Sequence, residues 1–301
     1  MTRSTGSLSE NCRVVAVGGG HGLGRVLASL SMLKENLTGI VATTDDGGST
    51  GRLRRASGCI AWGDTRNCLN QLCADNPTLP RTLFEYRYRD AGEMTGHNLG
   101  NMILLALDQM CVRPLDAVNL IRELLKVPSK ILPMSEQPAS LVAYVESQQI
   151  VGETTIDQLT VRPDSLTLIP DIQPPAEAIE ALENADIIIL GPGSFMTSIL
   201  PPLLMKEVAR AIYQSSAMKV YIGNVKPEPS AINTLSIPCI LDWLKEMTGI
   251  YPDVLLWPTE RPTPKGIRCI LHQTALADNL IDGTHNKQAL FDAINALWHK
   301  A

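Results

Sequence analysis

The sequence contains no CxxC pair, although seven cysteines are scattered along its 301 residues. An odd number of dispersed thiols does not suit a disulfide framework, and zinc knuckles need closely spaced cysteine pairs. We therefore expect reduced cysteines with structural roles.

Long apolar runs are missing as well. No stretch approaches the ~18 consecutive apolar residues of a membrane-spanning helix. The polar start over residues 1–11 also lacks the apolar core of a secretory signal. These two absences predict no membrane insertion and a cytoplasmic location.

Basic residues are outnumbered by acidic ones, 26 against 31, which gives a formal net charge of −5. Such a chain has no basic field from which counterion release could drive binding, so nucleic acid is not an expected partner. An anionic ligand must instead be bound by local loops. With 45% hydrophobic residues the chain can bury a large core, and we expect a disordered tail over 1–12 and a single domain over 13–301.

The first strong pattern is a strand, a glycine loop and a helix. An apolar run over 13–17 ends in three glycines, and apolar residues then recur at helical spacing from Leu23 to Leu33. A second β-rich run covers 37–43, so residues 13–45 form a βαβ unit with a right-handed parallel crossover. This predicts an α/β, Rossmann-like, doubly wound and mainly parallel sheet.

Later strands are expected at 186–190, 219–222, 254–257 and 268–271, the first of them buried on both faces. Between about 127 and 172 the pattern changes to short β-prone pieces separated by proline and glycine turns, without helical periodicity. We interpret this segment as an antiparallel β insertion. It carries few convergent polar residues, which leaves packing, a partner surface or a lid as its role.

The glycine loop is the strongest candidate site. Glycines let a backbone approach a phosphate closely, and the next helix offers free amides and the positive end of its dipole. The spacing differs from the GxGxxG dinucleotide fingerprint and from a P-loop, since no lysine follows. The alternative to a phosphate site is a turn in which the glycines serve only to adopt positive φ angles. The candidate ligand contacts are Gly18, Gly19, Gly20, His21, Gly22 and Leu23.

An acidic loop follows the second strand and should face the same edge of the sheet. Asp45 and Asp46 lie in the sequence TTDDGGSTG. Beside a phosphate site, carboxylates usually accept ribose hydroxyls or hold Mg²⁺. Asx turns in a surface loop are the alternative. Arg52, Arg54 and Arg55 come next and could bind phosphates or remain solvated.

Two further polar groups precede apolar helical stretches. Asp64, with Arg66 and Asn67, could cap a helix or contribute to the site. If a helix has already begun at His97, then His97 and Asn101 share a face. The alternative there is an internal hydrogen-bond network, because buried polar groups need partners. The candidates in this second group are His97, Asn98 and Asn101.

A second glycine turn follows the strand at 186–190. Its hydroxyls could cap the next helix or hold an oxyanion, but the sequence is not the GxSxG of a nucleophile elbow. The candidates are Gly191, Gly193, Ser194 and Thr197. The apolar segment 199–205 is either a subunit interface in a homo-oligomer or a buried helix.

Several motifs in this order resemble those of the bacterial gluconeogenesis factor family, over about residues 13–270. They are GGGHGLG, TTDDGGSTGRLR, GDTRNCLNQL, GHNLGN, VRPL at 112–115, MSEQP at 134–138 and GPGSFMTSILPPLL. That family is related to the 2-phospho-L-lactate transferases. The resemblance implies a Rossmann-like cytoplasmic protein that binds UDP-sugars such as UDP-N-acetylglucosamine and supports growth and cell shape on gluconeogenic carbon sources.

The resemblance also implies roles for residues. Gly18 to Leu23 would contact phosphate or base, Asp45 and Asp46 would lie near a sugar or Mg²⁺, and Gly191 to Thr197 with Asn224 would complete the pocket. The transferases carry an Asn-x-Gly-Asp-Asp type of loop where this chain has Thr43 to Gly48, so their metal geometry is not carried over.

Three functions follow as hypotheses. The first is a nucleotide-sugar-binding regulator that is recognised by an enzyme of cell-wall precursor metabolism and catalyses no reaction. The second is a Mg²⁺-dependent transferase of phosphorus-containing groups, in which Asp45 or Asp46 positions the metal and His97 or Arg66 neutralises developing charge. The third is an NAD(P)-dependent enzyme, which only the βαβ glycine loop suggests.

Overall fold

The computed structural model describes Leu8, residues 11–73 and residues 79–299. The tail predicted over 1–12 falls largely on residues 1–7 and 9–10, outside the described part of the chain. Leu8 itself is buried, and its backbone N–H donates to Asn295 Oδ1 at 2.6 Å.

Seven parallel strands form the central sheet, in the order β10-β9-β8-β7-β1-β2-β3. From β3 to β9 this is the 3-2-1-4-5-6 order of the Rossmann fold, with β10 added at one edge. The predicted doubly wound, mainly parallel sheet is therefore confirmed. The strands are β1 (Val14–Gly18), β2 (Leu37–Val41), β3 (Lys130–Pro133), β7 (Ile187–Leu190), β8 (Met218–Ile222), β9 (Val254–Pro258) and β10 (Ile270–Thr274).

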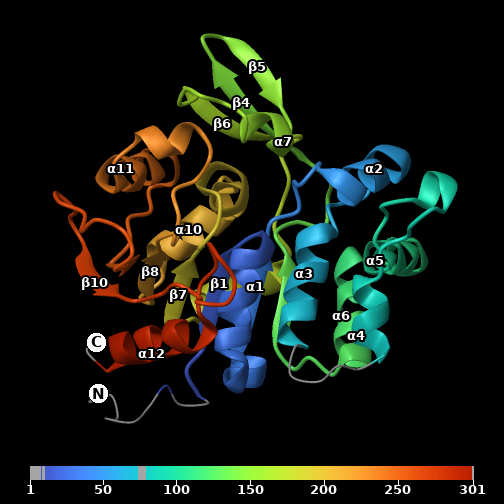
Figure 1. Ribbon diagram of the computed structural model, residues 1–301, viewed down its shortest axis with the longest axis horizontal. Helices are drawn as coiled ribbons and strands as arrows, with labels where there is room; N and C mark the ends of the chain where they lie inside the picture. The colour runs from blue at the N-terminus through green and yellow to red at the C-terminus, as the bar shows by residue number, and fades with distance from the viewer. Residues whose placement is uncertain (1–7, 9–10, 74–78, 300–301) are drawn as a thin grey trace.

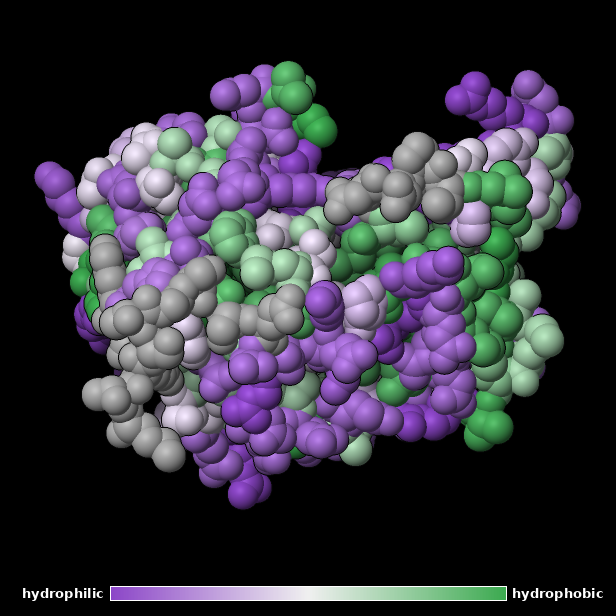
Figure 2. All heavy atoms as spheres, turned by 90° about the horizontal axis from the view of Figure 1, so that it is seen from below, coloured by the Kyte–Doolittle hydropathy of each residue, from purple (hydrophilic) through white to green (hydrophobic). Residues whose placement is uncertain are grey.

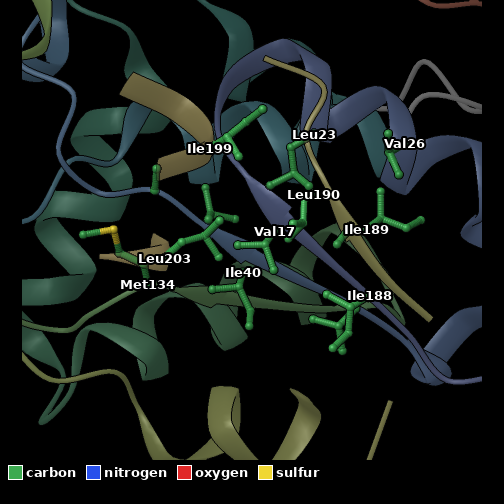
Figure 3. Packing of buried hydrophobic residues seen from close by; sticks show 14 of the residues in the cluster. Val17, Leu23, Val26, Ile40, Met134, Ile188, Ile189, Leu190, Ile199 and Leu203 are labelled. Carbon is green, nitrogen blue, oxygen red and sulfur yellow. The ribbon is translucent and has the colours of Figure 1, made fainter. Parts of the chain in front are cut away.

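Helices cover both faces of this sheet, because its central strands are apolar on both sides. Side chains alternate along a strand, so Ile189 lies toward Leu23 and Val26, whereas Ile188 and Ile40 belong to the opposite face (Figure 3). One layer contains α1 (Gly20–Ser29), α3 (Gly63–Leu72) and α12 (Lys287–Trp298), and the other contains α8 (Ala176–Glu183), α9 (Leu200–Leu203) and α10 (Lys206–Gln214).

Segment 199–205 lies inside the second layer. Ile199, Leu200 and Leu203 are fully buried, so the segment is a buried helix and not a subunit interface.

One further element, η3 (Phe195–Ile199, a π-helical turn), follows the central strand β7 and packs on β1 and α9. The other helical elements lie around the sheet edges and on the side of β2 and β3 (Figure 1). They are η1 (Ser31–Asn36), α2 (Gly48–Ser57), α4 (Leu79–Glu85), η2 (Gly92–Met94), α5 (Leu99–Met110), α6 (Pro114–Leu125), η4 (Ala231–Thr234) and α11 (Ile237–Thr248). Helix α2 and the start of α5 lie on the carboxyl side of β2. Their polar ends therefore face the edge of the sheet that is formed by the carboxyl ends of its strands.

The β insertion projects from the body of the molecule above this edge (Figure 1). It is a three-stranded antiparallel sheet in the order β5-β4-β6, formed by β4 (Ser140–Val145), β5 (Gln148–Val151) and β6 (Ser165–Ile169). Two details of the prediction were wrong. The piece at 130–132 is β3, which pairs in parallel with β2 in the main sheet. The insertion also contains a helical turn, α7 (Glu153–Ile156), which is too short for its periodicity to show in the sequence.

Within the described ranges, no helix combines the length and the apolar character needed to cross a membrane. All seven cysteines lie in those ranges, and none of them forms a disulfide there.

Candidate functional site

The chain reverses its direction of winding between β1 and β7, and the loops that follow these strands meet there. A Cβ atom placed on Gly22 would lie 2.3 Å from the carbonyl oxygen of Pro192, so the start of α1 packs directly on the second glycine loop. In open α/β sheets ligands bind outside the carboxyl ends of the strands at this position. We name the surrounding region, residues 18–20, 43–50, 63–65, 97–101 and 191–194, the switch-point site.

Four helices begin in this site: α1 at Gly20, α2 at Gly48, α3 at Gly63 and α5 at Leu99. The starts of α1, α2 and α3 lie close to one another. A Cβ on Gly19 would lie 2.5 Å from Asp64 Oδ2, and a Cβ on Gly63 would lie 2.4 Å from Thr50 Oγ1. The first turn of each helix carries unpaired amides and the positive end of the dipole. The arrangement therefore favours an anionic group.

Asp64 lies among these helix starts but does not cap its own helix. Trp62 occupies the N-cap position of α3, and no side chain makes the cap bond. The Asp64 carboxylate instead accepts the backbone N–H of Gly20, at the start of α1. Burial, followed by the nearby Asp45 carboxylate, raises the pKa of Asp64 to about 7. Asp64 is therefore a carboxyl group that is protonated in mildly acidic solution.

Glu153 enters the site from the insertion. Its carboxylate accepts the hydroxyl of Thr44, next to Asp45 in the acidic loop. Burial, with the Asp64 and Asp45 carboxylates as secondary causes, raises the pKa of Glu153 well above its usual value. The insertion is thus fastened to the loop after β2 by a buried carboxyl group.

A second carboxylate of the insertion reaches the glycine loop after β7. Ser194 Oγ and Thr197 Oγ1 donate to Asp157 Oδ1 at 3.2 and 3.0 Å. These two hydroxyls therefore bind Asp157, whereas the sequence suggested a helix cap or an oxyanion. Glu153 and Asp157 were both missed because the insertion was expected to lack convergent polar residues. Their i, i+4 spacing, which puts two acids on one face of a helical turn, was the available signal.

The two aspartates of the acidic loop have different partners. Asp46 Oδ1 accepts both the N–H and the hydroxyl of Thr154, at 2.9 and 2.8 Å. Asp45 Oδ1 accepts the N–H of Gly47 at 2.9 Å, which forms an Asx turn. Arg54 Nη1 donates to the carbonyl oxygens of Thr44 and Asp45 at 2.7 and 3.1 Å, so this arginine fixes the backbone of the loop.

His97, Asn98 and Asn101 come together, but not on one helix face. Helix α5 begins at Leu99 with Asn98 as its N-cap. His97 therefore precedes the helix and cannot share a helix face with Asn101. The three residues meet at Ser49 in α2, whose Oγ lies 3.2 Å from His97 Nδ1, 3.2 Å from the Asn98 backbone nitrogen and 3.5 Å from Asn101 Nδ2. Burial and the nearby Arg52 lower the pKa of His97, which favours a neutral imidazole. Sequence reasoning missed Ser49, because nothing in the sequence pairs it with residues almost fifty positions away.

Arg66 links this network to helix α4. Its Nε donates to Asn101 Oδ1 at 3.0 Å, and its guanidinium forms an ion pair with Glu85. Of the other predicted contacts, Asn67 is buried within α3, Leu23 is part of the core and His21 is exposed.

Three polar atoms of the switch-point site have no hydrogen-bond partner among the described residues: Thr43 Oγ1, Thr65 Oγ1 and Asn98 Nδ2. Their side chains are at most 1% exposed. Leaving such a group unpaired costs about 1–3 kcal/mol, so each of them calls for a polar partner.

Asn224 completes the second glycine loop. Its Oδ1 accepts the N–H of Gly193 at 3.0 Å, and its Nδ2 donates to the Gly193 carbonyl at 2.8 Å and to Glu228 Oε1 at 3.0 Å. Burial raises the pKa of Glu228, another residue absent from the prediction, to about 7. A cavity of about 280 Å³ opens beside Asn224 and Glu228, with Tyr221, Trp257 and Arg261 among its walls.

Replacing Asp157 by alanine is expected to lower the free energy of unfolding by about 1–3 kcal/mol, because two donated hydrogen bonds to a carboxylate are lost. Limited proteolysis should then cut the insertion faster, since β4–β6 lose one of their attachments. Asp157→Asn keeps an acceptor oxygen and is the matched control. Equal urea unfolding curves for Asp157→Ala and the parent would contradict this role.

The chain is similar to several known proteins in sequence and in fold. The family model described as "2-phospho-L-lactate transferase CofD" matches residues 14–292. A protein of Vibrio cholerae named "Putative gluconeogenesis factor" is 47% identical over 96% of this chain and 98% of its own length. One of Yersinia pestis with the same name is 48% identical over 96% and 94%. A crystal structure of a UPF0052 family member from Bacillus halodurans aligns with a TM-score of 0.86 at 30% identity, covering 93% of this chain and 98% of that one.

Proposed function

The chain belongs to the 2-phospho-L-lactate transferase CofD family, and on that premise we propose that it is a regulatory protein that binds a UDP-sugar at the switch-point site. Its relatives are named for gluconeogenesis. The proposed role is that of a cytoplasmic regulator of growth and cell shape under gluconeogenic conditions. The proposed partner is an enzyme of cell-wall precursor metabolism, which would respond to whether the regulator has bound its ligand.

The observation that carries the proposal is the convergence of four helix starts at one point of the sheet. A diphosphate has several oxygens and two or more negative charges, and free helical amides are its usual protein partners. Asp64 already accepts the N–H of Gly20, so the amides left for such a ligand at the start of α1 are those that follow Gly20 in the first turn. Ser49 lies in the first turn of α2. We assign the phosphates to this position.

The unpaired buried atoms support a ligand with further polar groups. Thr43 and Thr65 each offer a hydroxyl, and Asn98 offers an amide N–H. A sugar or ribose supplies hydroxyls that donate and accept, and these could pair with the three atoms if the loops around them open on binding, because the atoms are closed off from solvent here. We assign the remaining end of the ligand to the cavity beside Asn224, whose polar and aromatic walls suit a base or a sugar ring.

A magnesium ion would fit this site only in part. The described residues hold no group of three or more acidic, histidine or cysteine side chains arranged around a common metal position. Mg²⁺ often takes one or two carboxylates together with substrate phosphates. Asp46 accepts two hydrogen bonds from Thr154, whereas Asp45 accepts one, from Gly47. Asp45 is therefore the carboxylate that would hold the ion with the ligand's phosphates. Its chemical contribution would be to neutralise charge between the phosphates and the surrounding carboxylates.

A Mg²⁺-dependent phosphotransferase is the second candidate. The contact between Ser49 Oγ and His97 Nδ1 favours it, because a neutral imidazole beside a hydroxyl is a possible proton acceptor. Against it, Ser49 also accepts the N–H of Asn98 and so has a structural role at the start of α5. The regulator remains our first proposal.

Titration calorimetry with UDP-N-acetylglucosamine, GDP and NAD, each with and without Mg²⁺, separates these functions. We expect UDP-N-acetylglucosamine to bind at about −8 kcal/mol, in the micromolar range, and to remain intact on prolonged incubation. Asp45→Asn should weaken binding at least about tenfold, a loss of about 1.4 kcal/mol.

Asp253→Asn is the matched control for this titration, because Asp253 accepts the backbone N–H of Lys219 at the opposite end of the strands. Its affinity should equal that of the parent. Selective binding of GDP with Mg²⁺, or turnover of the UDP-sugar, would favour the transferase, and selective binding of NAD would exclude both candidates.

A further inference from the structure

A short hairpin connects α4 with α5 and reaches the switch-point site at His97 and Asn98. Its two arms are joined by backbone hydrogen bonds, from the Tyr88 nitrogen to the His97 oxygen at 3.0 Å and from the Gly96 nitrogen to the Tyr88 oxygen at 2.9 Å. We name residues 86–98 the rim hairpin. Figure 2 shows hydrophobic residues gathered on the side of the molecule where α4, α5 and α6 lie. The charged side chains of the hairpin are therefore not part of a broadly charged surface.

Two arginines from different elements reach the same turn of the rim hairpin. Arg52, on α2, donates through Nη2 to the carbonyl oxygen of Thr95 at 2.9 Å. Arg87, on the opposite arm of the hairpin, donates through Nη1 to the carbonyl oxygen of Gly96 at 3.1 Å. Gly96 makes room for the first of them, because its φ is +79° and a Cβ there would lie 3.3 Å from Arg52 Nη2. The two guanidinium groups are thus held at neighbouring residues of one turn.

Neither of these positive charges is neutralised by the protein. Within the part of the chain that the structure describes, Arg52 and Arg87 form no ion pair, and neither do Asp90 and Glu93 of the hairpin itself. A guanidinium has five N–H donors, and each of the two uses one of them on a backbone carbonyl. Two like charges in one turn repel each other, and a bound anion would remove this repulsion.

His97 adds a third donor beside the two arginines. Its Nδ1 lies 3.2 Å from Ser49 Oγ, and its other ring nitrogen has no partner among the described residues. Burial lowers the pKa of His97, and so does the nearby charge of Arg52. Ser49 and Arg52 are three residues apart on α2, so they share one face of that helix. The arginines therefore lie next to the phosphate position assigned above, one helical turn further along α2.

A phosphate suits this arrangement better than a carboxylate. A carboxylate has two oxygens in one plane, and a single arginine can occupy both of them. The oxygens of a phosphate point in several directions, so guanidinium groups from α2 and from the hairpin can bind different oxygens of the same ion.

We propose that Arg52, Arg87 and His97 form a second anion site, which binds the phosphate of a phosphorylated small molecule. This site goes beyond the proposed UDP-sugar site, because its two arginines lie on the rim hairpin and on the second turn of α2. Its existence does not require that the UDP-sugar be the ligand of the switch-point site.

Thermal unfolding with inorganic phosphate tests the proposal, at fixed pH and with sodium chloride adjusted to keep the ionic strength constant. A ligand that binds only the folded protein raises Tm by an amount set by its concentration and its dissociation constant. We expect a larger rise for the parent with phosphate than with acetate. Arg52→Gln and Arg87→Gln should each raise the phosphate dissociation constant at least about tenfold, because each removes charge-assisted hydrogen bonds.

Arg55→Gln is the matched control, since Arg55 is exposed on the same helix and removes the same charge. It should keep the parent's response to phosphate. Each rise in Tm is compared with the same variant without phosphate, so a change in basal stability does not enter the comparison.

Two results would overturn the second anion site. One is a parent whose Tm rises no more with phosphate than with acetate. The other is a rise that Arg52→Gln and Arg87→Gln both keep in full, which would mean that phosphate acts by exclusion from the surface or binds only at the helix starts. An equal loss in Arg55→Gln would also contradict the proposal, because net charge alone would then explain the effect.

Discussion

Replacing Asp64 by asparagine is expected to stabilise the protein at pH 8 and to remove the contribution of Asp64 to the loss of stability between about pH 4 and pH 7, a loss to which Glu153 and Glu228 also contribute. The pKa of Asp64 is raised to about 7 in the folded state by burial and by Asp45, whereas an unfolded aspartate titrates near 3.9. Between these values the folded protein binds more protons than the unfolded chain. Stability therefore falls as the pH rises through this window and stays low above it.

The size of this effect follows from the shift. About three pKa units correspond to about 4 kcal/mol. Asparagine keeps an acceptor for the Gly20 N–H and carries no charge. Urea unfolding of the parent and of Asp64→Asn at pH 5 and pH 8 should show about 2.6 kcal/mol of this effect, because the rest is already lost below pH 5.

Asp46→Asn is the control for this experiment, because Asp46 lies in the same site but is bound by Thr154. Between pH 5 and pH 8, Asp46→Asn should lose nearly the same free energy of unfolding as the parent. If Asp64→Asn and the parent lose the same free energy between pH 5 and pH 8, then Asp64 is not the group whose ionisation destabilises the fold. That result would also remove the reason to expect a protonated carboxyl group beside the proposed phosphate position.

Replacing Gly22 by alanine should lower the free energy of unfolding by about 3 kcal/mol or more. The new methyl group would lie 2.3 Å from the carbonyl oxygen of Pro192 and 2.9 Å from its carbonyl carbon. Both atoms are backbone, so one of the two glycine loops must move. We expect a fall in Tm of roughly 5 °C or more, together with loss of ligand binding, since both loops line the switch-point site.

Gly18→Ala provides the contrast within the same loop. A Cβ on Gly18 would meet its nearest neighbours, Gly191 and Leu23, at 3.8 Å, an ordinary contact distance. Gly18 also lies in strand β1, where alanine is acceptable. Its Tm should stay close to that of the parent, as measured by thermal unfolding. Equal loss of stability in the two variants would show that the packing of the two loops is not what requires Gly22.

Helix starts and carboxylates have opposite effects in this site, and their balance explains its chemistry. The amides at Gly20, Gly48 and Gly63 attract negative charge, while Asp64 and Glu153 add it. Burial disfavours the charged form of both carboxyl groups, which raises their pKa values. At neutral pH the site is therefore less negative than the count of its acidic residues suggests, and a diphosphate can approach.

Much of the fold could be predicted because the signals were local. Strand β7 is an uninterrupted apolar run, and α1 follows its glycines with apolar residues at helical spacing, so both could be recognised without knowing their neighbours. The parallel βαβ unit then brought the loops after β1 and β2 to one edge. Strand β3 was misplaced because a short edge strand has no sequence feature that says which sheet it joins.

The candidate site could be predicted only where a glycine or acidic motif marked it. Gly18–Gly20, Asp45 and Gly191–Ser194 lie where the two loops were expected to meet. The partners of Asp64, Ser194 and Thr197 could not be predicted, because each partner comes from another part of the chain. Ser49, Glu153 and Asp157 were missed for the same reason, since each is defined by a residue distant in sequence.

The sequence by itself determined the class of fold, the order of the central strands along the chain and the glycine loops, because hydrophobic periodicity and backbone freedom act over a few residues. Only the tertiary structure decided that Asp64 binds the start of α1, that Ser49 joins His97 to Asn101, and that Asp157 binds Ser194 and Thr197. These outcomes depend on hydrogen bonds and burial between segments that are far apart in the chain. Such contacts exist only once the sheet has brought the segments together.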